Sequence, residues 1–477
     1  MEMILGGQKA ASQDGKVIDV YNPATGELID TVPSASKKDI ETALKYAKKG
    51  KVKWAETPMH ERCRILMKYA DLVEEHMDEI TTLLAKDTGK AFREAKGEVA
   101  RVPANFRGYA EKALHFYGSS FTPPTAGNER DLVITKRQPL GIVVCIIPFN
   151  NPASAFAKKV APALAMGNAV IVKPASDNPL TDIRLTELLL ECGIPGEAAQ
   201  VLTARGPVIG EHLLSSPDIN AVSFTGSTDV GLGIAEIAAK NLHRVQLELG
   251  GNDSFIIFAD ADMERAVQEA VMARAPGAGQ LCAASKRFLV ENSIKDRFIE
   301  LLVEELKKLR IGDPLDPQTD VGCMINERAA LEVEEQIQHT IVQGARCVLG
   351  GKHYDRTFFE PTVLVDVTRD MDIAKDMEVF GPVFPIIGFD TLEEAVEITN
   401  ASKYGLNGGV ITNDFKKAIK VAEKMESGSC MINGSGNYGA CEFAFGGRKM
   451  SGIGREGICI NLEEMSQIKN IIMREVL

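Results

Sequence analysis

The sequence predicts an α/β protein of two doubly wound domains with a small β bridging arm. Short runs rich in β-branched residues alternate with longer stretches of helical periodicity, and this alternation occurs twice along the 477 residues. Strands separated by helices give βαβ crossovers, which predict a parallel sheet in each half. One isolated β-rich run precedes the first set of strands and predicts the arm.

The N-terminal part is predicted to be helical. Ser36 precedes Asp39 by three residues, a capping-box spacing, and apolar residues then recur at helical spacing to about position 47. A second long helix is predicted over residues 61–86.

Two sets of strands follow, with helical spacing between most of them. The first set is predicted at residues 141–147, 169–173, 200–202, 221–224 and 245–247. The second set is predicted at residues 254–258, 287–290, 363–365, 385–388, 408–412 and 430–432. Residues 131–138 have strand propensity but stand outside this alternation, so they are assigned to the arm.

The amino-acid composition argues against several classes of protein. A chain of this length with 45% hydrophobic residues buries a large core, and its net charge of −12 argues against a nucleic-acid or anionic-membrane surface. No run reaches the ~18 apolar residues of a membrane span, and the N-terminus lacks the pattern of a secretory leader. Nine scattered cysteines without a C-x-x-C pair predict a cytoplasmic protein with neither a disulfide framework nor a metal site.

Cys282 and Glu248 carry the chemistry. A lone cysteine is more often a buried small hydrophobe, but Cys282 lies among the small residues 277–285, where a substrate could approach. Glu248 ends an apolar-alternating run before two glycines, although by itself it could be a solvated strand-end carboxylate. A thiol attacks an aldehyde carbon, and a carboxylate activates the water that hydrolyses the resulting thioester. The pair predicts oxidation of an aldehyde to an acid.

Five further sequence blocks lie around this pair. They are Pro-Phe-Asn-Asn-Pro at 148–152, Val-Lys-Pro-Ala-Ser at 172–176, Phe-Thr-Gly-Ser-Thr-Asp-Val-Gly at 224–231, Glu-Val-Phe-Gly-Pro at 378–382 and Phe-Gly-Gly-Arg-Lys-Met-Ser-Gly at 445–452. In this order and at these separations, the chain resembles the aldehyde dehydrogenase superfamily from about Tyr21 to the C-terminus.

The resemblance implies a domain plan and an oligomer. The cofactor-binding domain is expected at residues 1–118 and 140–247, and the catalytic domain at 248–433. The bridging element is expected at 119–139 and 455–477, while residues 434–454 return to the cofactor domain. In the resembled family this element pairs with neighbouring subunits, so a homodimer or homotetramer is expected.

The resemblance also implies the catalytic roles. Cys282 is the expected nucleophile, Glu248 the general base, and the Asn150 amide an oxyanion donor together with the Cys282 backbone N–H. Asn150 could otherwise be a turn former. The usual family block is Pro-Trp-Asn-Phe-Pro, so Phe149 and Asn151 are departures.

Two alternatives from other classes stay open. One is a coenzyme-A-acylating dehydrogenase or an acyl reductase, which Glu248 disfavours because such relatives lack this glutamate. The other is a catalytically silent binding or structural member of the fold, which the joint presence of the three catalytic residues disfavours.

The cofactor is expected to be NADP or NAD. The residues expected to bind it are Lys173, Ser176, Arg205, Gly226, Ser227, Gly231, Gly250, Glu378 and Phe380. The 226–231 turn departs from G-x-G-x-x-G but still presents a helix N-terminus that suits a pyrophosphate. Ser176 replaces a glutamate common in strict NAD enzymes, and Arg205 could add a cation for a 2′-phosphate, although it could equally be a solvated loop residue.

Three residues are expected to contact the substrate. Arg101 and Lys158 stand where enzymes for apolar aldehydes carry apolar side chains, and Asn151 adds a polar donor. Taken singly, each cation could be a solvated helix residue. An arginine that semialdehyde enzymes carry six positions before the cysteine is Pro276 here, so the match is partial. The expected substrate is a short aldehyde with an anionic or hydroxyl group, such as a semialdehyde or a lactaldehyde-like compound.

Overall fold

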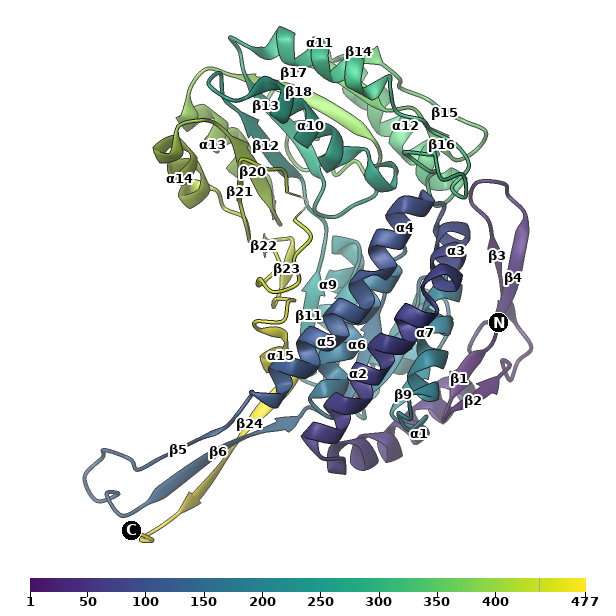
Figure 1. Cartoon of the computed structure of the whole chain (residues 1–477), viewed down its shortest axis with the longest axis vertical. Coiled ribbons are helices and arrows are strands. Elements are labelled where there is room, and N and C mark those ends of the chain that lie inside the picture. The colour runs from purple at the N-terminus through teal and green to yellow at the C-terminus, as the bar shows by residue number, and fades with distance from the viewer. Residues whose placement is uncertain (437) are drawn as a thin grey trace.

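The computed structural model describes residues 1–436 and 438–477 and has two α/β bodies with a projecting β arm (Figure 1). The predicted fold class is therefore confirmed. The first body is built on an eight-stranded sheet in the order β2-β1-β9-β8-β7-β10-β11-β23. Its strands are β1 Met3–Leu5, β2 Gln8–Ala10, β7 Ile142–Ile146, β8 Ala169–Lys173, β9 Ala199–Val201, β10 Ala221–Thr225, β11 Arg244–Glu248 and β23 Gly452–Ile453.

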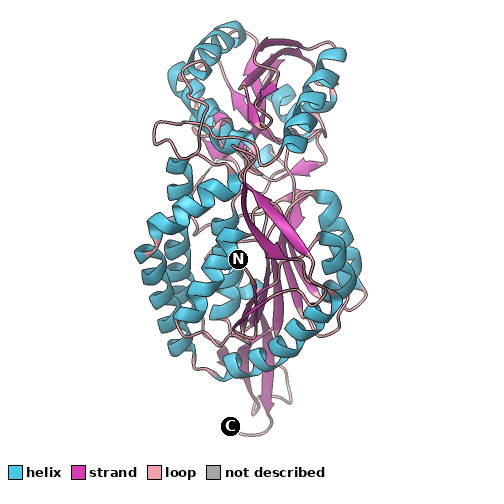
Figure 2. Cartoon of the chain, turned by 90° about the vertical axis from the view of Figure 1, so that its right-hand side faces the viewer, coloured by secondary structure: helices cyan, strands magenta, loops and turns pink. Residues whose placement is uncertain are grey.

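The five central strands, from β9 to β11, are parallel, and the outer pairings are antiparallel. Strands β7 and β8 are buried along their whole length, because helices cover both faces of the sheet (Figure 2). These helices are α1 Lys37–Glu56, α2 Met59–Glu75, α3 Met77–Thr88, α4 Phe92–Val99, α5 Arg101–Leu114, α6 Pro152–Ala165, α7 Leu180–Glu191, α8 Gly206–Val208 with the π-helix η1 Ile209–Leu214, and α9 Thr228–Ala239. A separate apolar core fills each face.

The second body is built on a seven-stranded sheet in the order β14-β17-β18-β13-β12-β20-β21. Its strands are β12 Asp253–Ile257, β13 Ser285–Glu291, β14 Arg346–Leu349, β17 Thr362–Val367, β18 Val383–Phe389, β20 Gly408–Ile411 and β21 Met431–Ile432. Its helices are α10 Met263–Arg274, η2 Pro276–Gly279, α11 Lys295–Leu306, α12 Glu327–Val342, η3 Asp372–Ala374, α13 Leu392–Asn400 and α14 Phe415–Lys424.

The arm is a three-stranded antiparallel sheet in the order β24-β6-β5 (Figure 1). Strand β24 (Ser466–Met473) pairs with all of β6 (Leu132–Pro139), and β5 (Ser119–Phe121) pairs with the other edge of β6. The segment predicted to lie outside the alternation is therefore β6. Helix α15 (Asn461–Glu464) leads into β24.

Small elements complete the chain. They are the hairpins β3 Val17–Tyr21 with β4 Leu28–Pro33 and β15 His353–Tyr354 with β16 Phe358–Phe359, and the pair β19 Tyr404–Gly405 with β22 Arg448–Lys449. Within the described residues, no helix is long and apolar enough to cross a bilayer.

The prediction of one helix over residues 61–86 was wrong. The chain leaves helical geometry at His76 (φ −99°, ψ 15°), which separates α2 from α3. Asp78 and Glu79 occupy the first turn of α3, where carboxylates stabilise the N-terminus of a helix, and His76 Nδ1 lies 2.6 Å from Glu79 Oε2. The predicted capping at the start of α1 is present, since Ser36 N–H donates to Asp39 Oδ2 at 2.7 Å.

Candidate active site

Cys282, Glu248 and Asn150 line one cavity of about 100 Å³. Glu248 is the last residue of β11, and Asn150 lies between β7 and α6, so both lie at the carboxyl ends of parallel strands. Cys282 comes from the second body, in the turn between η2 and β13. The three predicted catalytic residues are therefore brought together from segments more than 30 residues apart.

The backbone before Cys282 has an unusual shape. Gly277, Ala278 and Gly279 all have positive φ (60°, 51° and 74°). A Cβ on Gly279 would lie 2.2 Å from the carbonyl oxygen of Gly381, so this position needs glycine. The buried Arg274 holds the turn, because its guanidinium donates to the Gly279, Val379 and Val383 carbonyls at 2.6–3.2 Å.

The Asn150 side chain is tied to this turn. Its Nδ2 donates to the Gln280 carbonyl at 2.8 Å, two residues before Cys282. An amide nitrogen carries two protons, so one N–H remains for a developing oxyanion.

Burial and charge determine the protonation of the pair. Burial, and then the nearby Glu456 carboxylate, raise the pKa of Glu248 to about 7. Burial, and then the charge of Glu248, raise the pKa of the Cys282 thiol well above its ordinary value, against the lowering effect of Lys286 and Lys158. The resting nucleophile is a thiol, and attack needs a base beside it. Glu248 has the pKa that a general base needs near neutrality.

Sequence reasoning missed a buried ion pair next to Glu248. Lys159 Nζ lies 2.6 Å from Glu456 Oε1, and the two side chains are 0% and 5% exposed. Burial opposes the ionisation of Glu456, but Lys159 and Lys158 hold its pKa below the ordinary value. Glu456 lines the same cavity, so a negative charge stands close to the proposed base. No local pattern distinguishes Lys159 from the neighbouring Lys158 on α6, and its partner is 297 residues away.

The turn between β10 and α9 provides a helix N-terminus. Ser227 is the N-cap residue, and its side chain accepts from the Val230 N–H at 3.4 Å. Gly226 donates its N–H to the Glu248 carbonyl at 3.1 Å, which ties this turn to the catalytic strand. The remaining N–H groups of the first turn suit an anion.

Gly250 and Glu378 are in contact. A Cβ at position 250 would lie 2.3 Å from Glu378 Oε2, so glycine makes room for this carboxylate. Glu378 also accepts from Gly251 N–H at 3.1 Å and lies 3.3 Å from Lys286 Nζ. The Phe380 ring packs edge-on against Phe149, with centroids 5.9 Å apart.

Gly231 is buried against the residue that follows β11. It is buried in the first half of α9, and a Cβ there would lie 2.4 Å from Leu249 Cδ2. Glycine thus lets the helix approach the chain that follows β11, which is the packing role of the third glycine in a dinucleotide fingerprint.

The residues predicted to select the cofactor lie at the ends of β8 and β9. Lys173 is the last residue of β8, and burial lowers its pKa to about 8. The Ser176 hydroxyl donates to the Ala204 carbonyl at 3.4 Å, which brings it next to the exposed Arg205. A lysine, a hydroxyl and a guanidinium here fit an adenosine ribose, with or without a 2′-phosphate.

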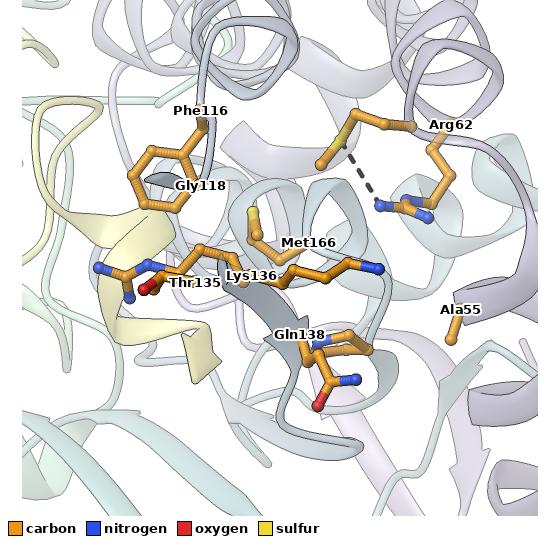
Figure 3. Close-up of a pocket in the computed structure, with 11 residues that line it drawn as sticks. Ala55, Arg62, Phe116, Gly118, Thr135, Lys136, Gln138 and Met166 are labelled. Atoms are coloured by element: carbon orange, nitrogen blue, oxygen red, sulfur yellow. Dashed lines mark hydrogen bonds between the residues drawn. The ribbon is translucent and has the colours of Figure 1, made fainter. Parts of the chain in front are cut away.

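All three predicted substrate residues line the catalytic cavity. Lys158 Nζ lies 5.1 Å from the centre of the Phe445 ring, which with Tyr438 and Phe443 forms an aromatic wall. Arg101 and Asn151 also line an adjoining cavity of about 420 Å³. Among the described residues, neither Arg101 nor Lys158 has a carboxylate within 4 Å of its side-chain nitrogens. A larger cavity of about 620 Å³ at the base of the arm contains none of the predicted site residues (Figure 3).

Comparisons with known proteins agree with this geometry. The sequence model of the aldehyde dehydrogenase family matches residues 9–471. The chain is 38% identical over 475 residues to a mitochondrial succinate-semialdehyde dehydrogenase of Arabidopsis thaliana, covering 99% of this chain and 89% of the relative. It is 36% identical to the succinate-semialdehyde dehydrogenase (NADP(+)) of Escherichia coli, with 98% and 96% covered, and 36% identical to a lactaldehyde dehydrogenase of Methanococcus maripaludis, with 96% and 97% covered.

Solved structures give the same result. An NADP-dependent enzyme of E. coli superposes with a TM-score of 0.96 at 35% identity, covering 99% of this chain and 98% of that one. A betaine aldehyde dehydrogenase from Staphylococcus aureus, solved in complex with NAD+, superposes with the same TM-score at 34% identity, covering 99% and 97%.

Proposed function

The chain belongs to the aldehyde dehydrogenase family, and on that premise we propose that it prefers a short aldehyde that carries a carboxylate or a hydroxyl group. The enzyme oxidises an aldehyde to the carboxylic acid with NAD or NADP. The observation that carries the proposal is the presence of Arg101 and Lys158 in the wall of the cavity that holds Cys282, with no carboxylate of the described residues within 4 Å of their side-chain nitrogens. A cation lining a small cavity is available to a substrate anion.

Names of relatives support this substrate class. Relatives from E. coli and A. thaliana are succinate-semialdehyde dehydrogenases, and one from M. maripaludis is a lactaldehyde dehydrogenase. Succinate semialdehyde carries a carboxylate, and lactaldehyde carries a hydroxyl beside its carbonyl group. The cavity of about 100 Å³ around Cys282 has room for a short aldehyde.

In the proposed mechanism, Glu248 takes the thiol proton as Cys282 Sγ bonds to the aldehyde carbon. The Asn150 Nδ2–H and the Cys282 backbone N–H stabilise the oxyanion. NAD(P)+ supplies the hydride acceptor. When the oxyanion collapses, the C–H bond breaks and a thioester on Cys282 remains.

Glu248 releases the thiol proton to solvent and then acts again, as a carboxylate, in the second half-reaction. It removes a proton from water as the oxygen bonds to the thioester carbon. The C–S bond then breaks, Cys282 leaves as the thiolate and recovers a proton, and the carboxylic acid departs. This second role of Glu248 disfavours the coenzyme-A-acylating alternative.

The cofactor proposal is that NADP is accepted as well as NAD. Ser176 places no negative charge beside Lys173, and Arg205 lies close by. At position 176 a 2′-phosphate would therefore meet a hydroxyl instead of a carboxylate, with Lys173 and Arg205 as nearby cations.

We further propose a cytoplasmic homo-oligomer. Ile468, Ile471 and Ile472 of β24 are 41–62% exposed on a strand whose outer edge is unpaired among the described residues, which suits pairing with another subunit. All nine cysteines are free, as expected of a protein in a reducing compartment.

The test is an aldehyde panel with both cofactors. Succinate semialdehyde, glyceraldehyde 3-phosphate, lactaldehyde, hexanal and benzaldehyde should be compared by kcat/KM, with NAD(P)H absorbance as the readout. The proposal expects one of the first three to be preferred. A preference for hexanal or benzaldehyde contradicts it.

A further inference from the structure

Lys90 is a buried cation that anchors the loop carrying Asn150. It follows α3 directly after Gly89, whose φ of 75° turns the chain, and it is 7% exposed. Its Nζ donates to the Asn150 backbone carbonyl at 2.8 Å and to Asn151 Oδ1 at 2.8 Å. Its third donor goes to Glu98 Oε2 at 2.5 Å. All three protons of the ammonium group are therefore used, two of them on the catalytic loop.

Glu98 extends the anchor to the other side of the loop. It lies in α4, is 3% exposed, and its second oxygen accepts from the Ser154 N–H at 3.2 Å, in the first turn of α6. The Lys90–Glu98 pair thus holds both the loop before α6 and the start of that helix. Burying two charges is costly, and replacing a buried ion pair by apolar side chains of similar volume is often neutral for protein stability. A contribution to stability alone therefore does not account for the Lys90–Glu98 pair.

We propose that Lys90 is a positioning residue that orients Asn150 for oxyanion stabilisation. This inference rests on the role of Asn150 in the proposed function. The Asn150 carbonyl on Lys90 fixes one end of the residue, and its Nδ2 on the Gln280 carbonyl fixes the other. Two anchors on opposite ends determine where the remaining Nδ2–H is directed.

Catalysis is sensitive to this placement. An oxyanion donor acts only when it lies at hydrogen-bond distance from the oxygen as the charge develops. A displacement of about 1 Å costs roughly a hundred-fold in rate. Losing Lys90 would free the Asn150 carbonyl and leave Glu98 without its partner.

The closing experiment is a double-mutant cycle on the full-length enzyme. The variants are Lys90→Met, Asn150→Ala and their combination, tested with the panel aldehyde that the wild-type enzyme turns over fastest. The readouts are the pre-steady-state rate of NAD(P)H formation, which reports acylation, and the Kd of the reduced cofactor by fluorescence. Lys90→Met should slow acylation by about ten- to a hundred-fold and leave cofactor binding within about two-fold.

The decisive comparison is made in the Asn150→Ala background. If Lys90 acts through Asn150, then adding Lys90→Met to Asn150→Ala slows acylation less than about three-fold further. If the ion pair only stabilises the fold, the two losses multiply. Should Lys90→Met not fold, Lys90→Arg keeps the charge but alters the donor geometry, and the same cycle applies to it.

A matched control exists at the opposite end of α6. Arg62 of α2 is a buried cation that donates to the carbonyl of Ala165, the last residue of α6, and to the carbonyl of Thr57, between α1 and α2. Figure 3 shows its side chain in the cavity at the base of the arm. Arg62→Met should lower stability without slowing acylation more than about two-fold.

The outcomes distinguish the positioning role of Lys90 from the catalytic role of Asn150. An unimpaired Lys90→Met enzyme, or losses that multiply in the double variant, overturns the positioning role alone. An unimpaired Asn150→Ala enzyme overturns the catalytic role of Asn150 and, with it, this inference.

Discussion

Glu248 and Cys282 line one cavity, and the charge of the carboxylate is the second cause, after burial, of the raised pKa of the thiol. The nucleophile is therefore held as a thiol until a base accepts its proton. Because Glu248 has a pKa of about 7, it changes protonation in the range where the enzyme would work. One residue can thus serve both half-reactions.

Variants of Glu248 and Cys282 should distinguish the roles of the two residues. Glu248→Gln should slow acylation, because the thiol loses the carboxylate that accepts its proton, and should slow hydrolysis of the thioester still more. A slowed burst of up to one equivalent of NAD(P)H per site should therefore form before turnover falls by about a hundred-fold or more. Rapid-quench or stopped-flow absorbance measures the burst. Cys282→Ser is the control and should give no burst while it binds cofactor normally. A folded Glu248→Gln enzyme with no burst would mean that acylation depends strictly on the carboxylate.

The hydrolytic step should depend on pH in a defined direction. Glu248 must be ionised to accept a proton from water, so the single-turnover rate of thioester hydrolysis should rise as the pH passes through about 7 and level off about one unit above. Ionisation of this buried group also costs stability. Its pKa is raised from 4.5, so the folded state binds more protons between those values, and its contribution to the free energy of unfolding falls as the pH rises through that window. A hydrolysis rate that does not vary between pH 6 and 8 would contradict the assignment.

Local patterns were enough to predict the strands that position the site. The predicted strand at residues 245–247 is β11, and the run at 169–173 coincides with β8, because buried β-branched runs between helices leave few other interpretations. Cys282 and Glu248 could be paired only through the family resemblance, since no local pattern reports that two distant turns share a cavity.

Long-range electrostatics could not be predicted. Lys90 and Lys159 are ordinary lysines in the sequence, and their partners are chosen by tertiary packing: Glu456 is 297 residues from Lys159, and Asn150 is 60 residues from Lys90. The break at His76 was missed because helical periodicity continues across it. Arg274 was missed for a related reason, since its acceptors are backbone carbonyls, which no sequence pattern distinguishes.

The cofactor prediction concerns position 176. Ser176→Glu should weaken NADP binding through repulsion of the 2′-phosphate and leave NAD largely unaffected, because ribose hydroxyls can donate to a carboxylate. A charged contact of ~1.5–3 kcal/mol corresponds to a change of roughly ten- to a hundred-fold in the NADP/NAD preference. The ratio of kcat/KM values for the two cofactors measures it. An unchanged ratio would show that this side chain does not face the ribose.

Alanine substitutions at two glycines of α9 should affect the stability of the protein differently. Gly231→Ala would place a Cβ 2.4 Å from Leu249 Cδ2 and should destabilise the protein by ~1–3 kcal/mol through overpacking. Gly233→Ala meets no atom within 4 Å and should be neutral or stabilise by up to ~1 kcal/mol, because alanine favours the helix. Urea unfolding midpoints of the two variants test this. Equal effects would contradict the close packing of α9 on the chain after β11.

The substrate prediction rests on the two cations in the cavity wall. Lys158→Met and Arg101→Met remove one charge each and keep most of the apolar stem, so packing of residue 158 against Phe445 is largely retained. Loss of one charge-assisted contact should lower kcat/KM for anionic aldehydes by roughly ten-fold or more, while hexanal changes little. Because Lys158 also affects Cys282 and Glu456 electrostatically, the comparison must be made between substrates within one variant. A variant that loses the same factor on hexanal as on succinate semialdehyde acts through the catalytic groups and not through the substrate. Loss of selectivity in Lys158→Met alone would assign the substrate anion to the inner cavity, whereas loss in Arg101→Met alone would assign it to the junction with the adjoining cavity that Arg101 also lines.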